Sequence, residues 1–227
     1  MLPITLIYAT RFTEREFAEK SALGRCLNIT YGRLPIKLMG FYNNSRGLGA
    51  CYNEAIARVT NDDEILVFVH DDVLIVDYYW IDKLFLGFKV FTLLGLAGNK
   101  RRVNKQPAWY AIDDKFTWDD PSNLSGIVGH GREFPCELSV YGTVMQRCKL
   151  LDGVLLATKK LTLVNNGIKF DESFKFHFYD MDLCRQFEQK NLAIGTIPLG
   201  IVHESGGRFG GPEWQDSYRQ YVEKWKA

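Results

Sequence analysis

A short apolar segment that ends in three polar residues constrains this chain most strongly. Residues 65–69 are β-branched and aromatic, which is typical of a buried strand rather than a helix. His70, Asp71 and Asp72 follow the segment directly. Ligands of open α/β sheets bind just beyond the carboxyl ends of strands, so we expect these side chains at a binding site.

The two adjacent acids admit two interpretations. Like charges repel, and burying either carboxylate is costly unless a cation neutralises it, which favours a divalent-metal site. Alternatively, Asp71 and Asp72 form a turn that caps the next helix, since Asp is a common N-cap residue. Carboxylate oxygens suit Mg²⁺ and Mn²⁺, which often bridge a protein carboxylate to the phosphates of a substrate.

Strands and helices alternate in the residues before these acids. Thr13 is placed to cap a helix that begins at Glu14 and continues to about Leu23. Apolar residues recur at helical spacing from Leu48 to Val59. This alternation predicts an α/β fold with a mostly parallel central sheet flanked by helices. The strands expected in this part are residues 4–9, 36–42 and 65–69.

The pattern becomes less regular in the second half of the chain. Residues 99–135 are irregular, polar and rich in Gly, Pro and Trp, and a loop this long is usually functional or mobile. Trp109 and Trp118 are candidates for a lid that stacks on a sugar or covers it, or for anchors of the loop. The further elements expected are helices at 77–88, 161–166, 180–190 and 212–227, a strand at 138–146, and one last strand at 193–202.

Composition and charge exclude several classes of protein. The chain has 227 residues, of which 46% are hydrophobic, which fits a globular domain. A net charge of +1 gives no general affinity for nucleic acid. Five cysteines without CxxC spacing indicate neither a zinc knuckle nor a disulfide framework, and a reducing cytosol is the simplest setting. No stretch has the features of a membrane span or a signal peptide.

Polar residues mark three further positions. Asp180 and Asp182 lie in the first turn of a predicted helix, where acids complement the helix dipole or act as a general base. His203 ends the last predicted strand, although a lone histidine is more often structural than a ligand. The basic residues 100–102 are interpreted as a solvated loop, from which one cation can reach phosphate. Together, the polar sites at element ends favour a functional interpretation.

Several segments, taken in order, resemble family 2 glycosyltransferases of the GT-A type over nearly the whole chain. Residues 67–73 resemble the aspartate motif, usually Asp-any-Asp, and residues 44–57 resemble the loop and helix before it. Leu151-Asp152-Gly153 resembles the acceptor-side Asp-Gly. Residues 170–185 are similar to a segment that normally reads Phe-Asp-Glu and then Glu-Asp-any-Asp-Leu-any-any-Arg, and Val202-His203 resembles the closing histidine.

The resemblance implies a single Rossmann-like GT-A domain over residues 1–227. Residues 1–98 would form the nucleotide-sugar half, and residues 99–227 the acceptor half with a C-terminal helix. It also implies inverting transfer from a nucleotide-sugar donor to a glycan or lipid-linked acceptor, with Mn²⁺ or Mg²⁺, in the assembly of surface polysaccharide. The expected location is the cytoplasm, with the inner face of the membrane as an alternative.

By position, the resemblance also assigns residue roles. Asp180 corresponds to the catalytic base, Asp72 and His203 to metal ligands, and Asp71 to a contact with the ribose or the sugar. The other substrate-binding residues that it implies are Thr10, Arg11, Asn44, Gly47, Asp152 and Gly153. The chain departs from the family pattern at three places: His70 replaces the first Asp of the motif, Tyr179 replaces a Glu, and Asn43-Asn44-Ser45 replaces an Asp-rich turn.

Asp180 is expected to be ionised at neutral pH. Apolar neighbours raise the pKa of a carboxyl group and a helix N-terminus lowers it, so the two effects should leave the pKa of Asp180 near its usual value. Asp182 points to another side of the helix, because residues i and i+2 do not share a face. We therefore expect Asp182 to be structural and to pair with Arg185.

Two other functions fit parts of the sequence. A protein of the same fold could bind a nucleotide sugar or a glycan without turnover, and the departures at His70, Tyr179 and Asn43 keep this alternative open. A metal-dependent phosphohydrolase built on His70 and the following acids would need further clusters of His and Asp. The four histidines are dispersed, which disfavours it.

Overall fold

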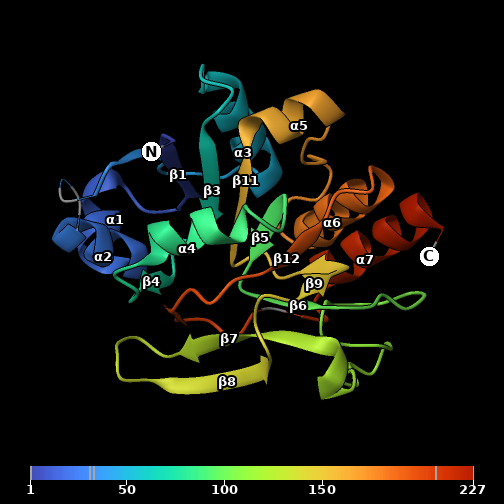
Figure 1. The fold of residues 1–227 in the computed structure, drawn as a ribbon. Helices are drawn as coiled ribbons and strands as arrows, with labels where there is room; N and C mark the ends of the chain where they lie inside the picture. Colours follow the sequence, from blue (N-terminus) through green and yellow to red (C-terminus); the bar gives the residue numbers. More distant parts are fainter. Residues whose placement is uncertain (1, 31, 33, 208, 227) are drawn as a thin grey trace.

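Two β-sheets and the helices around them make up the fold in the computed structural model, which describes residues 2–30, 32, 34–207 and 209–226 (Figure 1). The strands of the main sheet are β1 (Ile4–Ala9), β2 (Ile36–Phe41), β3 (Ile65–Val69), β5 (Leu93–Gly95), β9 (Arg147–Cys148), β11 (Leu155–Lys159) and β12 (Ile194–Thr196). They lie in the order β2-β1-β3-β11-β5-β12-β9. β2, β1, β3, β5 and β12 point one way, and β11 and β9 the other. The mostly parallel sheet is confirmed.

The central strands of this sheet are buried along their whole length, and they are apolar except for Thr5 and the hydroxyl of Tyr8 in β1. Every residue of β1 and β3 is buried, so neither strand shows the alternation of a half-exposed strand. β2 lies at the edge of the sheet and is only partly buried. The predicted strands at 4–9 and 65–69 have these bounds in the structure, and the strand predicted at 36–42 ends one residue earlier.

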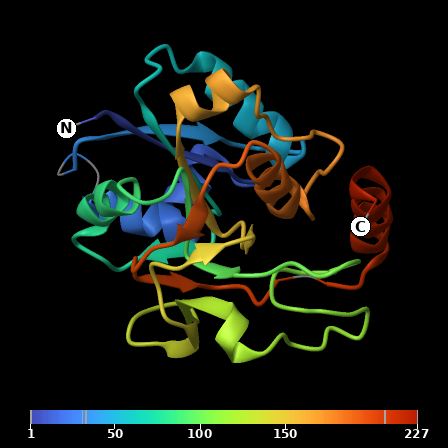
Figure 2. The same cartoon turned by 45° about the vertical axis from the view of Figure 1, so that its right-hand side comes forward.

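A second sheet packs beside the first, and the sequence did not predict it. Figure 2 shows β7 and β8 as an outer layer beneath the main sheet. The order is β10-β6-β7-β13-β4, with β8 paired to β7. Its strands are β4 (Val73–Ile75), β6 (Ala97–Asn99), β7 (Leu124–His130), β8 (Glu137–Gly142), β10 (Leu150–Leu151) and β13 (Ile201–His203).

The expectation that residues 99–135 are irregular is wrong for β7, and its glycines explain the error. Gly126 has a φ of 124° beside a β-bulge, where a Cβ atom would collide with the carbonyl oxygen of Leu96. A Cβ atom at Gly129 would lie 2.7 Å from the carbonyl oxygen of Ile201. Glycine inside a strand marks such a close backbone approach, yet it removes the apolar pattern by which a strand is recognised.

The single last strand that the sequence predicted is two strands in two different sheets. β12 ends at Thr196 in the main sheet, and β13 begins at Ile201 in the second sheet. Pro198 lies between them and has no backbone N–H for a strand ladder. The chain also crosses between the sheets at Leu96, between β5 and β6, and at Lys149, between β9 and β10.

Helices pack on both sides of the main sheet. The predicted cap of α1 is confirmed, since Thr13 and Glu16 form a capping box, but α1 ends at Lys20 and a second helix begins after Ser21. Figures 1 and 2 show α7 lying beside α6. In the part of the chain that the structure describes, no helix is both long and apolar enough to cross a membrane. The helices are α1 (Glu14–Lys20), α2 (Ala22–Thr30), α3 (Leu48–Arg58), α4 (Trp80–Gly87), α5 (Lys160–Asn166), α6 (Tyr179–Gln189) and α7 (Pro212–Trp225), with a 3-10 turn η1 (Pro121–Asn123).

Candidate active site

Four segments from different parts of the chain line one cleft at the carboxyl end of β3. The residues after β3 and the end of β13 contribute His70 to Asp72 and His203. The turn between β10 and β11 contributes Asp152 and Gly153, and the first turn of α6 contributes Tyr179 and Asp180. Asp72 and Asp180, which are 108 residues apart in the sequence, therefore share a site.

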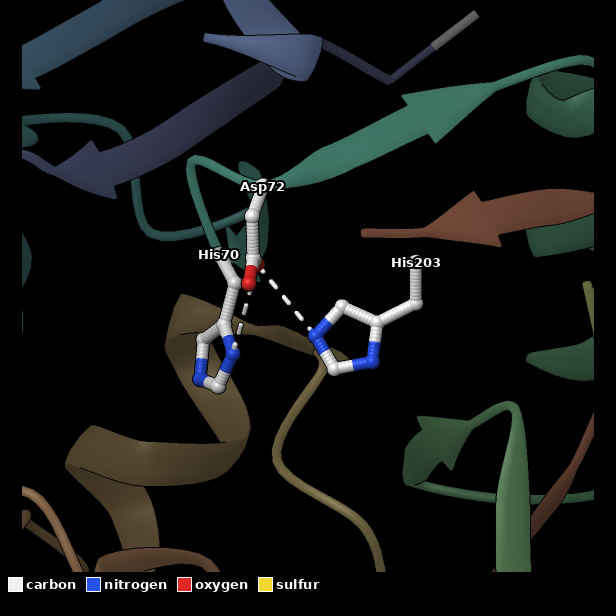
Figure 3. Close-up of side chains that lie close together, drawn as sticks. All are labelled: His70, Asp72 and His203. Carbon is white, nitrogen blue, oxygen red and sulfur yellow. Dashed lines mark ion pairs between the residues drawn. The ribbon is translucent and has the colours of Figure 1, made fainter. Parts of the chain in front are cut away.

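His70, Asp72 and His203 form a compact group of nitrogen and oxygen atoms (Figure 3). Oδ1 of Asp72 lies 3.3 Å from Nε2 of His203 and 4.0 Å from Nδ1 of His70. One ligand atom from each residue lies within 4.8 Å of the others. Among the described residues, Oδ1 of Asp72 is buried and accepts no hydrogen bond. This donor set suits Mn²⁺, which binds carboxylate and imidazole ligands.

The charges of these groups depend on one another. Burial would raise the pKa of Asp72, but the ion pair with His203 outweighs burial and lowers it to about 2. Burial would likewise lower the pKa of His203, and Asp72 raises it above its usual value. For His70, burial dominates and lowers the pKa, so this imidazole is neutral at neutral pH. A neutral imidazole beside a carboxylate is the form that binds a metal.

Tyr179 sets which nitrogen of His70 carries the proton. The Tyr179 hydroxyl donates to the carbonyl oxygen of Gly153 at 2.9 Å and lies 2.7 Å from Nε2 of His70. A hydroxyl has one proton, so it must accept the hydrogen bond from Nε2–H of His70. Nδ1 then keeps its lone pair, and Nδ1 is the nitrogen that faces Asp72. Such an outer hydrogen bond orients a metal-binding histidine and fixes its tautomer.

Asp180 is a partly buried carboxyl group at the start of α6. Its Oδ2 accepts a hydrogen bond from the backbone N–H of Gly153 at 2.9 Å, and its Oδ1 accepts one from Met181 at 2.8 Å. Burial, together with the nearby charge of Asp152, nevertheless raises the pKa of Asp180 to about 7. The expectation of an ordinary pKa is therefore wrong, because two backbone donors do not offset the loss of solvent.

Most of the chain matches a known protein family. Residues 36–203 match the model of a family described as a glycosyltransferase-like family. The match extends from β2 to β13 and includes His70, Asp72, Asp180 and His203 of the cleft, whereas Ala9 and the lining residues after His203 lie outside it. The chain belongs to this glycosyltransferase-like family. No curated protein matches its sequence.

Solved structures share the fold of this family member. The structure of GalNAc-T7 with UDP, GalNAc and Mn²⁺ matches with a TM-score of 0.54 and 11% identity, over 98% of this chain and 48% of that chain. The structure of S. aureus TarS residues 1–349 matches with a TM-score of 0.52 and 12% identity, over 97% of this chain and 64% of that chain. The chain thus spans slightly less than half of the first of these longer chains and slightly less than two thirds of the second. The likeness shows that its fold is of the GT-A type.

Asp152 and Gly153 of the glycosyltransferase-like chain form a tight turn against α6. Oδ2 of Asp152 accepts a hydrogen bond from the indole N–H of Trp109 at 2.6 Å, and Oδ1 accepts one from Val154. A Cβ atom at residue 153 would collide with the hydroxyl of Tyr179. Glycine therefore lets the turn approach α6 closely enough to bond Asp180.

The other predicted substrate contacts lie on the β1 and β3 side, and not all of them line the cleft. Asp71 lines it, and burial raises the pKa of Asp71 despite a hydrogen bond from Thr10. Arg11 is exposed, the side chain of Asn44 bonds the nearby loop, and Gly47 caps α3. These three residues and Thr10 are absent from the cleft lining, so their contact with substrate stays a prediction.

Asp182 does not pair with Arg185 as the sequence predicted. It is fully buried, and its carboxylate bonds Lys224 at 2.6 Å and the indole N–H of Trp225 at 2.9 Å. Arg185 instead packs over the Trp225 ring and lies 3.8 Å from Glu188. The prediction failed because α7 is distant in the sequence and supplies the partner.

Sequence reasoning does not assign a site role to His70 or Tyr179, and for Trp109 it left open a lid over the sugar or an anchor of the loop. His70 stands out in the sequence only as a departure from the family motif, and its position at a strand end is the signal that it belongs with Asp72. Tyr179 is a second departure, but its contacts with His70 and Gly153 follow only from the fold. Trp109 lies in the cleft wall as a buried residue and bonds Asp152.

Proposed function

We propose that this chain transfers a sugar from a nucleotide-sugar donor to a hydroxyl group of an acceptor, with a divalent metal and with inversion at the anomeric carbon. The observation that carries the proposal is the presence, in one cleft, of a His-Asp-His group and a separate, partly buried carboxyl group, that of Asp180. The family and the fold supply the reaction class.

His70, Asp72 and His203 would hold Mn²⁺ or Mg²⁺ through two imidazole nitrogens and one carboxylate oxygen. The buried Oδ1 of Asp72 supports this assignment, because it is paired with His203 at 3.3 Å but accepts no hydrogen bond from the described residues, which leaves it able to bind a ligand. When bound, the ion would stabilise the charge that develops on a leaving diphosphate. Since the GalNAc-T7 structure contains UDP and Mn²⁺, UDP-sugars are the first donors to test.

Asp180 would serve as the general base on the acceptor side. The acceptor oxygen would form a bond to the anomeric carbon as the bond from that carbon to the diphosphate oxygen breaks. The hydroxyl proton would pass to Asp180. A single displacement of this kind inverts the anomeric centre, and the Gly153 N–H would hold the carboxylate in place throughout.

The first experiment measures UDP binding by calorimetry with and without Mn²⁺. We expect wild-type protein to bind UDP more tightly with Mn²⁺ and Asp72→Asn to lose that increase, because the variant removes the shared carboxylate ligand. Asp71→Asn is the matched control, since it alters the neighbouring acid and should keep the increase. An unchanged Mn²⁺ effect in Asp72→Asn would exclude this residue as a ligand.

A release assay then separates transfer from binding without turnover. A panel of UDP-sugars is incubated with Mn²⁺, with and without glycan acceptors, and the UDP released is measured. Turnover that depends on acceptor supports the transferase. Tight binding without turnover across the panel would instead favour the non-catalytic alternative.

A further inference from the structure

Four aromatic side chains form a continuous path that leads out of the cleft, and we call them the aromatic ladder: Trp109, Tyr110, Tyr141 and Trp118. Trp109 lines the cleft, and its ring centroid lies 5.0 Å from that of Tyr141 and 5.6 Å from that of Tyr110. The Trp118 ring stacks on Tyr141 at 5.8 Å and lies 4.5 Å from Tyr110. The ladder thus joins the cleft wall to the outer surface.

The inner end of the ladder is fixed to the acceptor side of the cleft. The indole N–H of Trp109 donates to Asp152, whose neighbour Gly153 bonds the carboxylate of Asp180. A ligand that places a hydroxyl group at Asp180 therefore has Trp109 beside it. Any part of that ligand that extends away from the base along this wall meets the remaining rings.

The outer end of the ladder is exposed without being loose. Trp118 is 54% exposed, yet the loop that carries it is paired through Ala111 and closed by the bond from Asp119 N to Tyr110 O. The Asp119 carboxylate is buried and accepts hydrogen bonds from Asn99, Arg101 and Asn123. Because this exposed aromatic ring is already held in place, a ligand can bind it without the entropic cost of ordering the loop.

We propose that the aromatic ladder is an extended acceptor subsite, which binds the second and later sugar residues of an oligosaccharide acceptor. The inference rests on the proposed function and adds the acceptor class to it. The face of an aromatic ring is electronegative and apolar, so it attracts the C–H groups on the apolar face of a pyranose ring. Trp118 is exposed, and Tyr110 and Tyr141 are partly exposed, so aromatic surface is accessible at more than one position, as a chain of sugars requires.

The structure favours a glycan over a lipid tail as the occupant. Asp113, Asp114 and Asp120 lie within five residues of Trp118 in the sequence, and all three are at least partly exposed. Their carboxylates can accept hydrogen bonds from sugar hydroxyl groups, whereas a hydrocarbon chain would only desolvate any that it covered. An exposed ring on a loop that carries such acceptors matches the mixed apolar and hydroxylated surface of a saccharide.

The test measures oligosaccharide binding to the full chain by calorimetry. The probes are linear tetrasaccharides of β1,4-linked glucose, β1,4-linked N-acetylglucosamine and α1,4-linked glucose, each compared with its monosaccharide. We expect at least one tetrasaccharide to bind about tenfold or more tightly than its monosaccharide, and Trp118→Ala to remove about tenfold of that affinity. Trp118→Phe should retain most of it, because a ring remains.

Phe134→Ala is the control for the loss of an exposed aromatic side chain. Phe134 is 67% exposed and belongs to a different surface hollow, so its removal should leave glycan affinity unchanged. The inference is overturned if every tetrasaccharide binds no better than its monosaccharide, if Trp118→Ala binds as wild type does, or if a polyisoprenyl phosphate is bound in a Trp118-dependent manner and the glycans are not.

UDP binding with Mn²⁺ distinguishes failure of this inference from failure of the proposed function. If UDP binds with Mn²⁺ and a UDP-sugar donates its sugar, but glycan affinity depends neither on glycan length nor on Trp118, the subsite is absent and the proposed transferase stands. If glycans bind through Trp118 but no UDP-sugar binds or reacts, the ladder stands and the chain is a glycan-binding protein.

Discussion

The hydroxyl group of Tyr179 joins three parts of the candidate site. It bonds His70 after β3, it bonds the Asp152–Gly153 turn, and it belongs to the first turn of α6 beside Asp180. Sequence reasoning located Asp72, His203 and Asp180, because each lies at the end of a recognisable element. It could not find this link, because the contact depends on how the elements pack.

Tyr179→Phe should weaken metal binding while it preserves the fold. The variant removes the acceptor of the His70 Nε2–H, so His70 can adopt the other tautomer and turn its N–H toward Asp72. We expect a loss of Mn²⁺ affinity of about 10- to 100-fold, the usual effect of losing such an outer hydrogen bond, measured by calorimetry in the presence of UDP.

Tyr52→Phe is the matched control for this prediction. Tyr52 is a neighbouring buried tyrosine, with its ring 6.0 Å from that of Tyr179, and its hydroxyl has no hydrogen-bond partner among the described residues. Its loss should leave Mn²⁺ affinity unchanged. An equal loss in both variants would show general loosening of the core instead of a specific role for the Tyr179 hydroxyl.

The raised pKa of Asp180 predicts a pH-dependent transferase. A base must be ionised, so kcat/KM should rise with pH and level off above a midpoint near the Asp180 pKa of about 7. Asp152→Asn removes a nearby negative charge that raises the pKa of Asp180, so the midpoint should move to lower pH. A midpoint that stays in place in this variant would contradict the coupling between the two acids.

Asp180→Asn should lower activity and change how stability depends on pH. Transfer should fall by about a hundredfold or more. The folded-state pKa of Asp180 lies above the unfolded value, so the wild-type carboxyl group contributes stability at low pH and loses it as pH rises through about 7. Relative to wild type, the variant should therefore be more stable at a pH of about 8 than at a pH of about 4, as shown by urea unfolding at both values.

At the scale of elements, the sequence predicts those whose pattern is local. The buried strands β1 and β3 and the inward face of α6, with Leu183, Cys184 and Phe187, follow from apolar runs and helical spacing. β7 was missed because its glycines replace the side chains by which a strand is recognised. The pairing of α6 with α7 was missed because it depends on contacts across about 40 residues of intervening chain.

Lys224→Met tests the contact between α6 and α7. Lys224 is the cationic partner of the buried Asp182, and it also bonds Asp171 at 2.7 Å. Its loss leaves a buried carboxylate without a cation and should lower the free energy of unfolding by about 1–3 kcal/mol, since Lys224 itself is partly exposed. Urea unfolding measures the loss, and Lys226→Met, two residues further on, should be close to neutral.

At the scale of the whole molecule, the two sheets form one body. The chain crosses between them at Leu96, at Lys149 and between β12 and β13. The sequence predicted the first part of the main sheet, but the second sheet is assembled from short strands that are far apart in the chain. The proposed donor and acceptor halves meet inside β6, so the proposed division after residue 98 does not coincide with a structural boundary.

This continuity predicts cooperative unfolding. Tryptophan fluorescence reports on residues near both sheets, and far-UV circular dichroism reports on secondary structure throughout, so their midpoints in urea should coincide. UDP with Mn²⁺, at about 100 times the dissociation constant, should raise the free energy of unfolding by about 2.7 kcal/mol and move both urea midpoints up together. Two separate transitions would show that the sheets unfold independently.

The position of β11 has a consequence for how such a protein can be divided or recombined. β11 lies between β3 and β5, and the other partner of β5 is β12. A fragment of residues 1–98 would leave one edge of β3 bare and β5 without any neighbour. The proposed nucleotide-sugar half therefore depends on strands from the second half of the chain, and a first half exchanged between proteins would have to fit β11 and β12 of its new partner.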